Sequence, residues 1–398
     1  MAVFNKSDIL LPKEINNNWA VIACDQFTSD IDYWKRVEAT VGNDNSTFNL
    51  ILPEIYLEDN IEKRIEKINK NMQSYLDNGV FECYENSMIF VRRVQNDGLV
   101  LDGIVGEINL CDYDYKIGAK TKIRASEQTV VERIPPRVKI RKDAPIELPH
   151  ILLLIDDPAL SVIEPVADKK DDFKKLYDLE LIENGGKVQG YLLSDEVADK
   201  ITEALEDLIK TQDDKLLFAV GDGNHSLATA KTIAENTSNK KAQVALVEIV
   251  NIHSPAINFE PIYRVLENCD VMQVIDDFVK DNGGEYNGED AHYFTVLFKD
   301  GRRKIGLKPT AKLPVGTLQS YLDEYLKSHS EIKIDYIHGE DELERLCKKS
   351  GTVGFLFDGM GKDELFDAIK QDGSLPRKTF SMGHAVDKRY YIEGRKIK

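Results

Sequence analysis

A short polar motif, Gly-Asp-Gly-Asn-His-Ser at residues 221–226, follows an apolar run that ends at Val220 and precedes a segment with helical periodicity. Glycine accepts backbone angles that other residues resist, so the chain can turn sharply here. The backbone N–H groups and the positive dipole end of a helix N-terminus attract anions. The motif therefore predicts a turn that binds a phosphate or a carboxylate. The residues predicted to contact that anion are Gly223, Asn224 and Ser226.

His225 and Asp222 are the members of the motif that we assign to catalysis. The imidazole of His225 can donate a hydrogen bond to an anion. Asp222 would repel an anion, so it is expected to bind an amine, a hydroxyl or a metal ion. In the alternative interpretation, the two glycines only form a tight turn, and Asn224 or Ser226 caps the helix. His225 favours a binding site, because capping a helix needs no imidazole.

A second group of candidate residues lies in residues 120–150, an unpatterned segment that is rich in arginine and proline although the protein is acidic. Arginines grouped in such a segment suit bidentate recognition of phosphate or carboxylate. Glu127 is the acid among them that is placed to act as a general base. The alternative is a loop held by surface or interdomain salt bridges. The arginines predicted to bind the substrate are Arg124, Arg133 and Arg137.

His150, Asp156 and Asp157 flank a buried apolar strand expected at residues 151–155. Acids at the carboxyl end of a sheet strand commonly face a ligand crevice. If the site holds a metal ion such as magnesium, Asp157 or Asp222 is its expected ligand. The two aspartates are also ordinary turn residues before a proline. The same two interpretations apply to Asp25 and Gln26. Structural roles are expected for His253, His384, Lys388 and Arg389.

These residues need strands and helices to position them, and the hydrophobic periodicity predicts both. A strand at 215–220 leads into the motif, a helix covers 225–236, and another strand covers 244–250. Strands that alternate with helices indicate an α/β protein with layered packing. Residues 120–150 are expected to form a long ordered loop or crossover. Further elements are expected as helices at 59–76, 171–179 and 195–209, two strands joined by a turn at 95–98, and a hairpin turning at Asp300-Gly301.

The length of 398 residues exceeds one ordinary hydrophobic core, so two or three domains are expected. We expect an N-terminal α+β domain with the arginine-rich segment at 1–150. An α/β segment carrying the motif follows at 151–270, and an α+β region follows at 271–398.

Charge and composition exclude several classes of function. A formal net charge of −17 argues against binding nucleic acid, which requires Lys and Arg to neutralise phosphates. No apolar stretch approaches the roughly 20 residues that span a membrane, and residues 1–12 lack the features of a signal peptide. The five cysteines are scattered without a CxxC pair, which suits a reducing cytoplasm. A homo-oligomer is compatible with the sequence.

Three stretches, residues 123–158, 218–231 and 375–397, resemble the family named domain of unknown function 1015. The usual Asp-Gly-His-His-Arg motif of that family is similar to the phosphate-binding turn of the ParB/sulfiredoxin superfamily, which includes free serine kinases. The resemblance implies a mixed α/β fold that has a ParB/sulfiredoxin-like core and additional α+β domains. Asp222, Gly223 and His225 match the motif. Asn224 replaces its first histidine, Ser226 replaces its arginine, and Glu127 corresponds by chain order to the glutamate that activates serine.

Together these features predict a phosphoryl-transfer enzyme of the serine kinase or phosphoserine phosphatase type, acting on a small amino-acid-like or phosphorylated compound. The resemblance implies a nucleotide or another phosphoryl donor. A Mg²⁺ ion held by the substrate phosphates is compatible with this chemistry. Because sulfiredoxins need a cysteine where Asn224 stands, sulfinic acid reduction is not expected. The alternative function is a sensor that binds a phosphorylated metabolite or a nucleotide without turning it over.

Overall fold

The computed structural model describes residues 2–210 and 213–398 of the chain. Its contacts divide the chain into two compact units. The first unit contains Met1–Ile257 and Gly383–Lys398, and the second contains Asn258–Met382, so the second is inserted into the sequence of the first. Positions 150 and 270, where domain boundaries were expected, lie inside the first and the second unit respectively.

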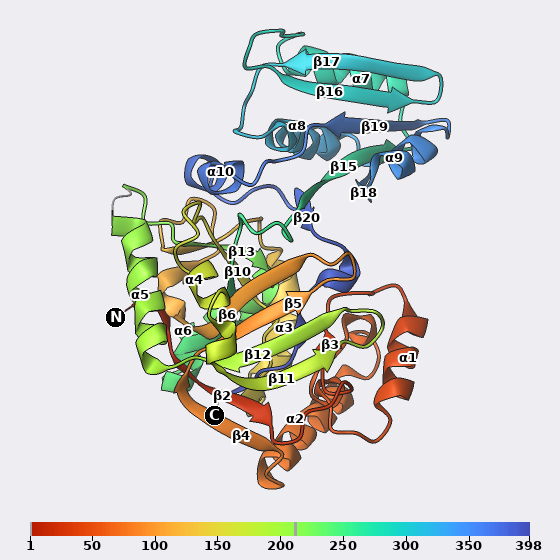
Figure 1. Cartoon of the computed structure of the whole chain (residues 1–398). Coiled ribbons are helices and arrows are strands. Elements are labelled where there is room, and N and C mark those ends of the chain that lie inside the picture. Colours follow the sequence, from red (N-terminus) through yellow and green to blue (C-terminus); the bar gives the residue numbers. More distant parts are fainter. Residues whose placement is uncertain (1, 211–212) are drawn as a thin grey trace. The chain divides into compact units, whose positions relative to one another are not determined.

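A mixed sheet of ten strands forms the centre of the first unit (Figure 1). Its strands are β1 (Phe4–Asn5), β5 (Ile89–Val94), β6 (Val100–Asn109), β7 (Tyr113–Asp114), β8 (Ile123–Ala125), β10 (Leu152–Ile155), β11 (Lys174–Glu180), β12 (Lys187–Leu192), β13 (Phe218–Asp222) and β14 (Val244–Asn251). They lie in the order β11-β12-β5-β6-β14-β10-β13-β8-β7, and β1 also pairs with β6. β13 runs parallel to β8 and antiparallel to β10, whereas β10 runs parallel to β14.

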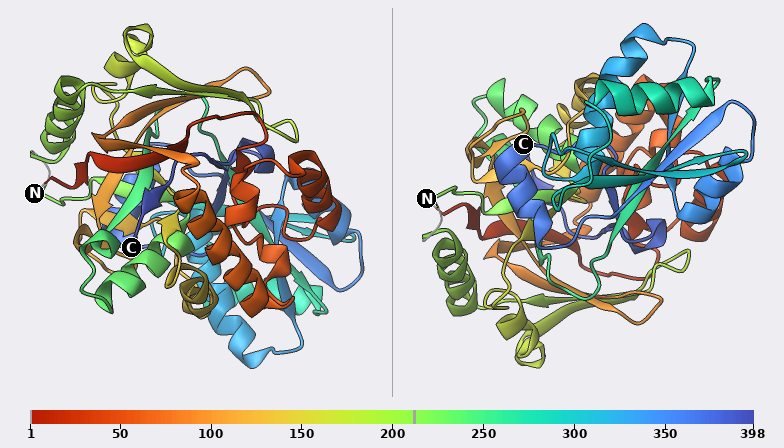
Figure 2. Two further views of the ribbon diagram at one scale, coloured as in Figure 1. Left: turned by 90° about the horizontal axis from the view of Figure 1, so that it is seen from below. Right: turned by 90° about the horizontal axis from the view of Figure 1, so that it is seen from above.

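Helices cover both faces of this sheet, because alternate residues of a strand point to opposite sides. In β5, Phe90 belongs to a core cluster that also holds Leu227, while Val91 belongs to a second cluster with Trp34. The helices of the unit are α1 (Ile31–Val41), α2 (Ile61–Asp77), α3 (Ile134–Arg141), α4 (Glu164–Ala167), α5 (Asp195–Lys210) and α6 (Asn224–Glu235). Helices α5 and α1 lie on opposite sides of the unit in Figures 1 and 2. The α/β class expected from the sequence is confirmed.

Several elements lie where the periodicity placed them. Helices α2, α5 and α6 match their predicted ranges within a few residues, and Gly79, with a φ of 64°, follows the end of α2. Strands β5 and β6 form the predicted hairpin. Short strand pairs complete the unit: β2 (Ser7–Pro12) with β4 (Phe81–Ser87), β3 (Val21–Ile22) with β21 (Tyr390–Tyr391), and β9 (Ile146–Glu147) with β22 (Arg395–Lys396).

Two predictions about secondary structure were wrong. The helix expected at 171–179 is the edge strand β11, in which Tyr177 and Leu179 are buried two residues apart, the period of a strand. Residues 120–150 contain β8, α3 and β9 and are not a loop. Pro135 and Pro136 occupy the first turn of α3, where a missing backbone N–H breaks no helical hydrogen bond.

The second unit is a sheet with helices of its own. Its strands are β15 (Phe259–Glu267), β16 (His292–Phe298), β17 (Gly301–Leu307), β18 (Lys333–His338), β19 (Thr352–Phe357) and β20 (Phe380–Met382). They lie in the order β17-β16-β19-β15-β18, with β20 also beside β15, and β16 and β17 form the hairpin predicted at Asp300-Gly301. The helices are α7 (Val271–Asp281), α8 (Pro314–Ser328), α9 (Glu340–Cys347) and α10 (Glu364–Asp372).

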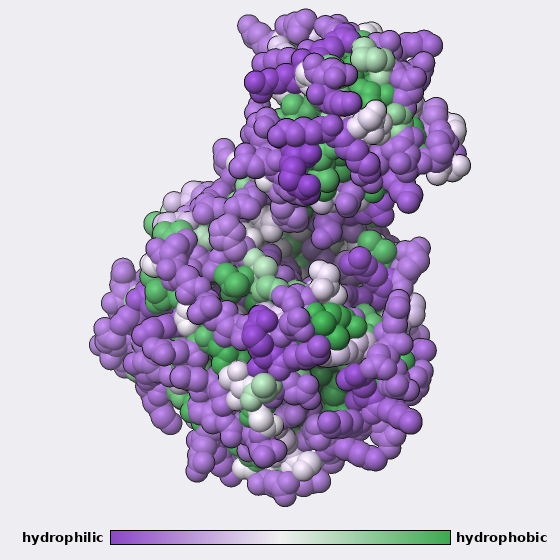
Figure 3. Space-filling model, turned by 90° about the vertical axis from the view of Figure 1, so that its right-hand side faces the viewer, coloured by the Kyte–Doolittle hydropathy of each residue, from purple (hydrophilic) through white to green (hydrophobic). Residues whose placement is uncertain are grey.

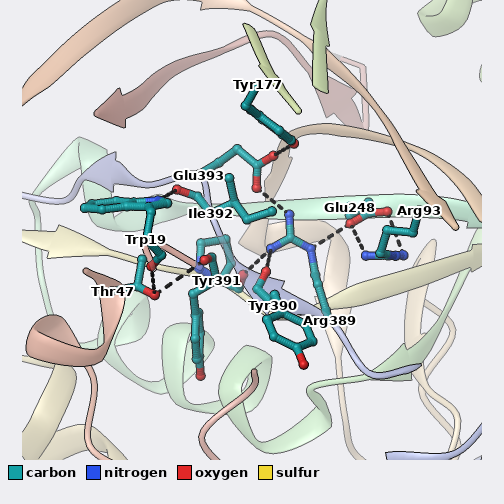
Figure 4. A network of polar contacts seen from close by, with 11 residues as sticks. Trp19, Thr47, Arg93, Tyr177, Glu248, Arg389, Tyr390, Tyr391, Ile392 and Glu393 are labelled. Carbon is teal, nitrogen blue, oxygen red and sulfur yellow. Dashed lines mark hydrogen bonds and ion pairs between the residues drawn. The ribbon is translucent and has the colours of Figure 1, made fainter. Parts of the chain in front are cut away.

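The segment 383–398 returns to the first unit and is held there by a buried ionic network (Figure 4). Arg389 donates hydrogen bonds to carboxylate oxygens of Glu248 and Glu393, each at 2.7 Å, and to the carbonyl oxygen of Pro149 at 2.7 Å. Arg93 bonds to Glu248 from the other side at 3.0 Å. Burial by itself would lower the pKa of Arg389, but the charges of Glu393 and Glu248 raise it above its usual value. Residues far apart in the sequence thus share one charge cluster.

The visible surface is mainly hydrophilic, and its hydrophobic residues form separate patches (Figure 3). Large apolar side chains exposed on the described residues are scattered along the sequence: Ile31, Val100, Ile117, Val131, Leu160 and Met272. No helix within 2–210 or 213–398 combines the length and the apolar character needed to cross a membrane.

Candidate active site

The predicted motif forms a very tight junction between β13 and α6. Gly221 and Asp222 still belong to the strand, and helix α6 begins at Asn224, so Gly223 alone makes the turn. Gly223 has a left-handed backbone with a φ of 80°, and no side chain caps the helix. A Cβ atom at this position would lie 3.0 Å from Cα of Ile151, on the neighbouring segment before β10. Glycine is therefore required both for the backbone angle and for the close approach.

We expect the substitution Gly223→Ala to destabilise the first unit by about 1 kcal/mol or more, because an L side chain is strained at this angle and would meet backbone atoms. Gly118 is a matched control, since its φ is 79° and nothing lies within 4 Å of its added Cβ. Thermal melts of G223A and G118A separate the two contributions. Equal melting temperatures would show that the contact with Ile151 has no cost.

The start of α6 offers unpaired donors. Its hydrogen-bond ladder begins with the bond from Leu227 N–H to the carbonyl oxygen of Gly223, 2.9 Å long. In the described part of the chain, the backbone N–H groups of Asn224 and Ser226 have no acceptor. Asp222 Oδ1 accepts a bond from Gly223 N–H at 2.8 Å. Asp222 Oδ2 and Asn224 Oδ1 are buried atoms without a hydrogen-bond partner. Hydrogen-bond donors and acceptors around this one turn thus both lack partners in the protein.

Glu127 belongs to a segment that runs beside this turn. Because β8 is parallel to β13, with Ala125 opposite Val220, residues that follow β8 emerge at the same sheet edge as the motif. The hydroxyl of Ser126 donates to the carbonyl oxygen of Val220 at 2.5 Å. The N–H of Val130 donates to Nε2 of His225 at 3.3 Å. A neutral His225 therefore carries its proton on Nδ1, which makes that atom the donor.

The three predicted arginines lie in different places. Arg124 does not reach the turn, because this residue is 3 % exposed and its guanidinium binds the carboxylate of Asp214 and the carbonyl oxygen of Thr121. These partners precede β13 and β8, at the opposite edge of the sheet from the motif. Arg133 is exposed at the start of α3. Arg137, one turn later, donates to the carbonyl oxygen of Arg133 at 2.8 Å and pairs with Glu54.

The pairing of Arg124 predicts an acid-sensitive contribution to stability. The hydrogen bond from Arg124 lowers the pKa of Asp214 below its ordinary value of 3.8. A carboxyl group with a depressed pKa in the folded state stabilises the fold above its unfolded pKa, and this stability is lost as the pH falls through the folded value. We expect D214N to be less stable than the wild type at pH 5, with the difference shrinking as the pH falls below about 4. Urea unfolding followed by tryptophan fluorescence measures this, because Trp19 and Trp34 both lie in the first unit. A difference that grows on acidification would contradict it.

A cavity of about 140 Å³ lies against α6 and α3. Ser226 and Thr229 line it from α6, and the ion pair of Arg137 with Glu54 also faces it. Its apolar lining comprises Leu50, Ile51, Leu52, Leu57, Met72, Ile140, Ala144, Ile146, Leu148 and Ile151. Cys24 is in the wall as well, but burial and then Asp25 raise the pKa of its thiol to about 12, so it stays protonated. The cavity suits a small molecule with both an ionic and an apolar part.

His150 connects this cavity with a second acid. Its Nδ1 lies 2.9 Å from the hydroxyl oxygen of Tyr391, which accepts a hydrogen bond from the N–H of Cys24. Its Nε2 lies 3.4 Å from Oγ of Ser226 and 3.8 Å from Oδ2 of Asp25. Burial raises the pKa of Asp25, but the electrostatic effect of the neighbouring His150 and the hydrogen bond from Gln26 lower it more. Asp25 is therefore a second carboxylate beside the motif.

The described residues do not build a metal cage. No group of three or more His, Cys, Asp or Glu side chains within 2–210 and 213–398 is arranged to hold a metal ion. Both carboxylate oxygens of Asp157 accept bonds from Ser161, and one also accepts from Val162 N–H. Asp157 follows the carboxyl end of β10, which is antiparallel to β13, so it lies at the edge away from the motif. Asp222 faces Lys388 Nζ at 3.7 Å, and a cation there disfavours a second one. The residues present do not fit magnesium.

Sequence reasoning missed two contributors from the returning segment. Lys388, expected to be structural, lies beside Asp222, and Tyr391 holds His150. No local pattern marks either residue, because their partners are more than 150 positions away in the sequence. His253 instead pairs with Asp156 at 2.8 Å, at the opposite edge of the sheet.

Comparisons with known proteins place the chain in a family. The model of a family described as Protein of unknown function (DUF1015) matches residues 6–325. No curated protein matches the chain. Among solved structures, a free serine kinase in complex with AMP is 13 % identical with a TM-score of 0.43, over 73 % of this chain and 91 % of that chain. A conserved hypothetical protein from Pyrococcus furiosus is 15 % identical, with a TM-score of 0.40 over 73 % and 94 % of the two chains. SbnI with a C-terminal truncation, from Staphylococcus aureus, is 9 % identical, with a TM-score of 0.37 over 70 % and 82 %.

Proposed function

The chain belongs to the DUF1015 family, as its sequence motifs predicted, and from the geometry of the turn we propose that it is a phosphoryl-transfer enzyme. Its substrate in this proposal is a small amino-acid-like compound, phosphorylated on a hydroxyl group or dephosphorylated there. The phosphoryl group binds at the start of α6. A nucleotide or another phosphorylated compound is the donor in the kinase direction.

The observation that carries the proposal is the uncapped start of α6. A helix N-terminus with unpaired amides and no side-chain cap binds an anion through oriented N–H groups and the helix dipole. The N–H groups of Asn224 and Ser226 have no acceptor in the described chain, and the hydroxyl of Ser226 adds a further donor. Asp30 caps α1 by accepting from Tyr33 N–H, whereas α2, α9 and α10 have no side-chain cap, as at α6. The start of α6 is marked in addition by the buried oxygens Oδ2 of Asp222 and Oδ1 of Asn224, which have no hydrogen-bond partner.

The residues around the turn suit the two needs of phosphoryl transfer, which are positioning and charge stabilisation. In the kinase direction, the hydroxyl oxygen of the acceptor forms a bond to phosphorus while the bond from phosphorus to the donor's bridging oxygen breaks. The leaving group keeps that electron pair. Glu127 takes the proton of the acceptor hydroxyl, and Nδ1 of His225 donates to a phosphoryl oxygen. In the phosphatase direction, water is the acceptor.

The cavity beside Ser226 is the expected place for the acceptor molecule. Arg137 and Glu54 present opposite charges to one another and to the cavity, which complements the carboxylate and ammonium groups of an amino acid. An engineered protein cavity of about 150 Å³ holds a benzene molecule, so a volume of about 140 Å³ admits a compound of similar size. Free amino acids with a short hydroxylated side chain meet this limit.

Turnover tests the proposal. Purified protein is incubated with phosphoserine alone, and with serine plus ATP, ADP or pyrophosphate, and the products are followed by phosphorus NMR. The proposal expects formation of inorganic phosphate in the first case or phosphoserine in the second. If none of these mixtures reacts while thermal shift still detects binding of phosphate compounds, the protein is a sensor and the enzymatic proposal is wrong.

A further inference from the structure

We propose that Lys388, supplied by the segment that returns to the first unit, is the cation that binds the phosphoryl group at the start of α6. This inference rests on the proposed function and adds a binding residue to the same site.

Lys388 is covered but lacks a hydrogen-bond partner. Its side chain is 13 % exposed, and its Nζ lies 3.7 Å from Oδ2 of Asp222, which is too long for a hydrogen bond. The hydrogen bonds of the described residues give this ammonium group no acceptor in the protein. An ammonium group has three N–H donors, and no hydrogen bond of the described residues occupies those of Lys388. A ligand with several acceptor oxygens would satisfy them.

Several polar groups around Lys388 also lack hydrogen-bond partners, and they include both donors and acceptors. Oδ2 of Asp222 and Oδ1 of Asn224 are buried without hydrogen bonds, and the N–H groups of Asn224 and Ser226 lack acceptors. Buried polar groups are nearly always paired, so several open ones in a single turn indicate an absent partner. A phosphoryl group accepts from Lys388 and from the two amides. A hydroxyl group of the substrate can donate to the open oxygens.

Three arginines of the first unit are already engaged in ion pairs. Arg124 is bound to Asp214, Arg137 to Glu54, and Arg389 to Glu248 and Glu393. Phosphoryl transfer needs positive charge at the equatorial oxygens, where charge accumulates. Lys388 can supply that charge without breaking a hydrogen-bonded ion pair, because its Nζ lies 3.7 Å from Asp222.

Its neighbour holds Lys388 in place. Arg389 is fixed by the buried carboxylates, and its carbonyl oxygen accepts from the N–H of Ala23 at 2.9 Å. The residue that follows Lys388 is therefore anchored by its side chain and by its backbone. A cation positioned in this way loses little entropy when the anion binds.

Calorimetric titration with inorganic phosphate and pyrophosphate tests the inference. We expect K388M to bind either probe at least tenfold more weakly than the wild type, and K388R to retain most of the affinity. K231M is the matched control, because Lys231 lies on α6 itself and its side chain is similarly buried, 18 % exposed, but it bonds to the carbonyl oxygen of Leu110. It should bind both probes as the wild type does.

The double variant D222N/K388M separates binding from mere neutralisation of Asp222. If Lys388 only balanced the charge of Asp222, removing both charges would restore wild-type affinity for phosphate, and the inference would be overturned. If Lys388 contacts the anion, the double variant stays at least tenfold weaker. The double variant also leaves no unpaired buried charge at this pair, so it supports the measurement even if K388M alone does not fold.

The two proposals fail in different ways. A wild type that binds phosphate through Lys388 but turns over none of the substrates contradicts the enzymatic function and leaves the lysine assignment intact. A wild type that is active while K388M has the same phosphate affinity and the same KM contradicts the lysine assignment alone. If the wild type binds neither phosphate nor pyrophosphate, the lysine assignment is wrong.

Discussion

Replacement of Arg389 by methionine is expected to lower the free energy of unfolding of the first unit by about 3 kcal/mol or more. Arg389 is 2 % exposed and makes three hydrogen bonds of 2.7 Å, two of them to the carboxylates of Glu248 and Glu393. Both carboxylates belong to fully buried residues. Removing one partner of a buried ion pair leaves the other charge uncompensated, which costs more than the pair itself contributes.

Urea unfolding followed by tryptophan fluorescence measures this loss. Both tryptophans, Trp19 and Trp34, lie in the first unit, so the signal reports that unit and not the inserted one. The variant R36M is the matched control, because Arg36 also pairs with one glutamate, Glu183, but is 55 % exposed. We expect R36M to unfold at nearly the wild-type urea concentration. Equal midpoints for R389M and R36M would show that the network of Figure 4 is not needed for stability.

The second large effect concerns the proton acceptor. If the protein transfers phosphoryl groups as proposed, E127Q should lower kcat by about a hundredfold or more, because general base catalysis typically contributes two to four powers of ten. Glutamine keeps the shape of the side chain but cannot accept the proton of the acceptor hydroxyl. The KM for the donor should change little, since the amides and cations that bind phosphate are untouched.

Asp25 provides the matched comparison for Glu127. It is the other acid beside the motif, and its carboxylate lies 3.8 Å from Nε2 of His150. We expect D25N to reduce kcat by less than E127Q, because Asp25 orients His150 and does not receive the proton. Steady-state rates of the two variants decide between the acids. If D25N loses more activity than E127Q, the roles are exchanged and Asp25 is the base.

Local patterns were sufficient to predict the motif and its helix. The two glycines and the apolar period of α6 lie within a few residues of each other, and the short-range rules for turns and helices apply directly. The same rules failed for β11, where Tyr177 and Leu179 follow the period of a strand within a short charged segment. They also failed for α3, because two prolines are normally a sign of a loop although the first helical turn accepts them.

Contacts between residues far apart in the chain could not be predicted from the sequence. Arg124 was expected at the phosphate, but its partner Asp214 is 90 residues away, and only the fold shows that they meet. Glu127 was assigned by its order along the chain, and its position beside the motif depends on the parallel pairing of β8 with β13. No sequence pattern marked Lys388, because the whole inserted unit separates it from Asp222 along the chain and only the fold brings the two residues together.

The interruption between residues 257 and 383 also affects how this protein is made. The pairing of β3 with β21, the ionic bonds of Arg389 and the place of Lys388 all need residues that the ribosome delivers after the inserted unit. During synthesis all ten strands of the large sheet emerge before the inserted unit, but one core cluster of the first unit lacks Tyr390, Tyr391, Ile392 and Ile397 until that unit has been made. Premature termination before residue 383 would yield a first unit without its closing segment.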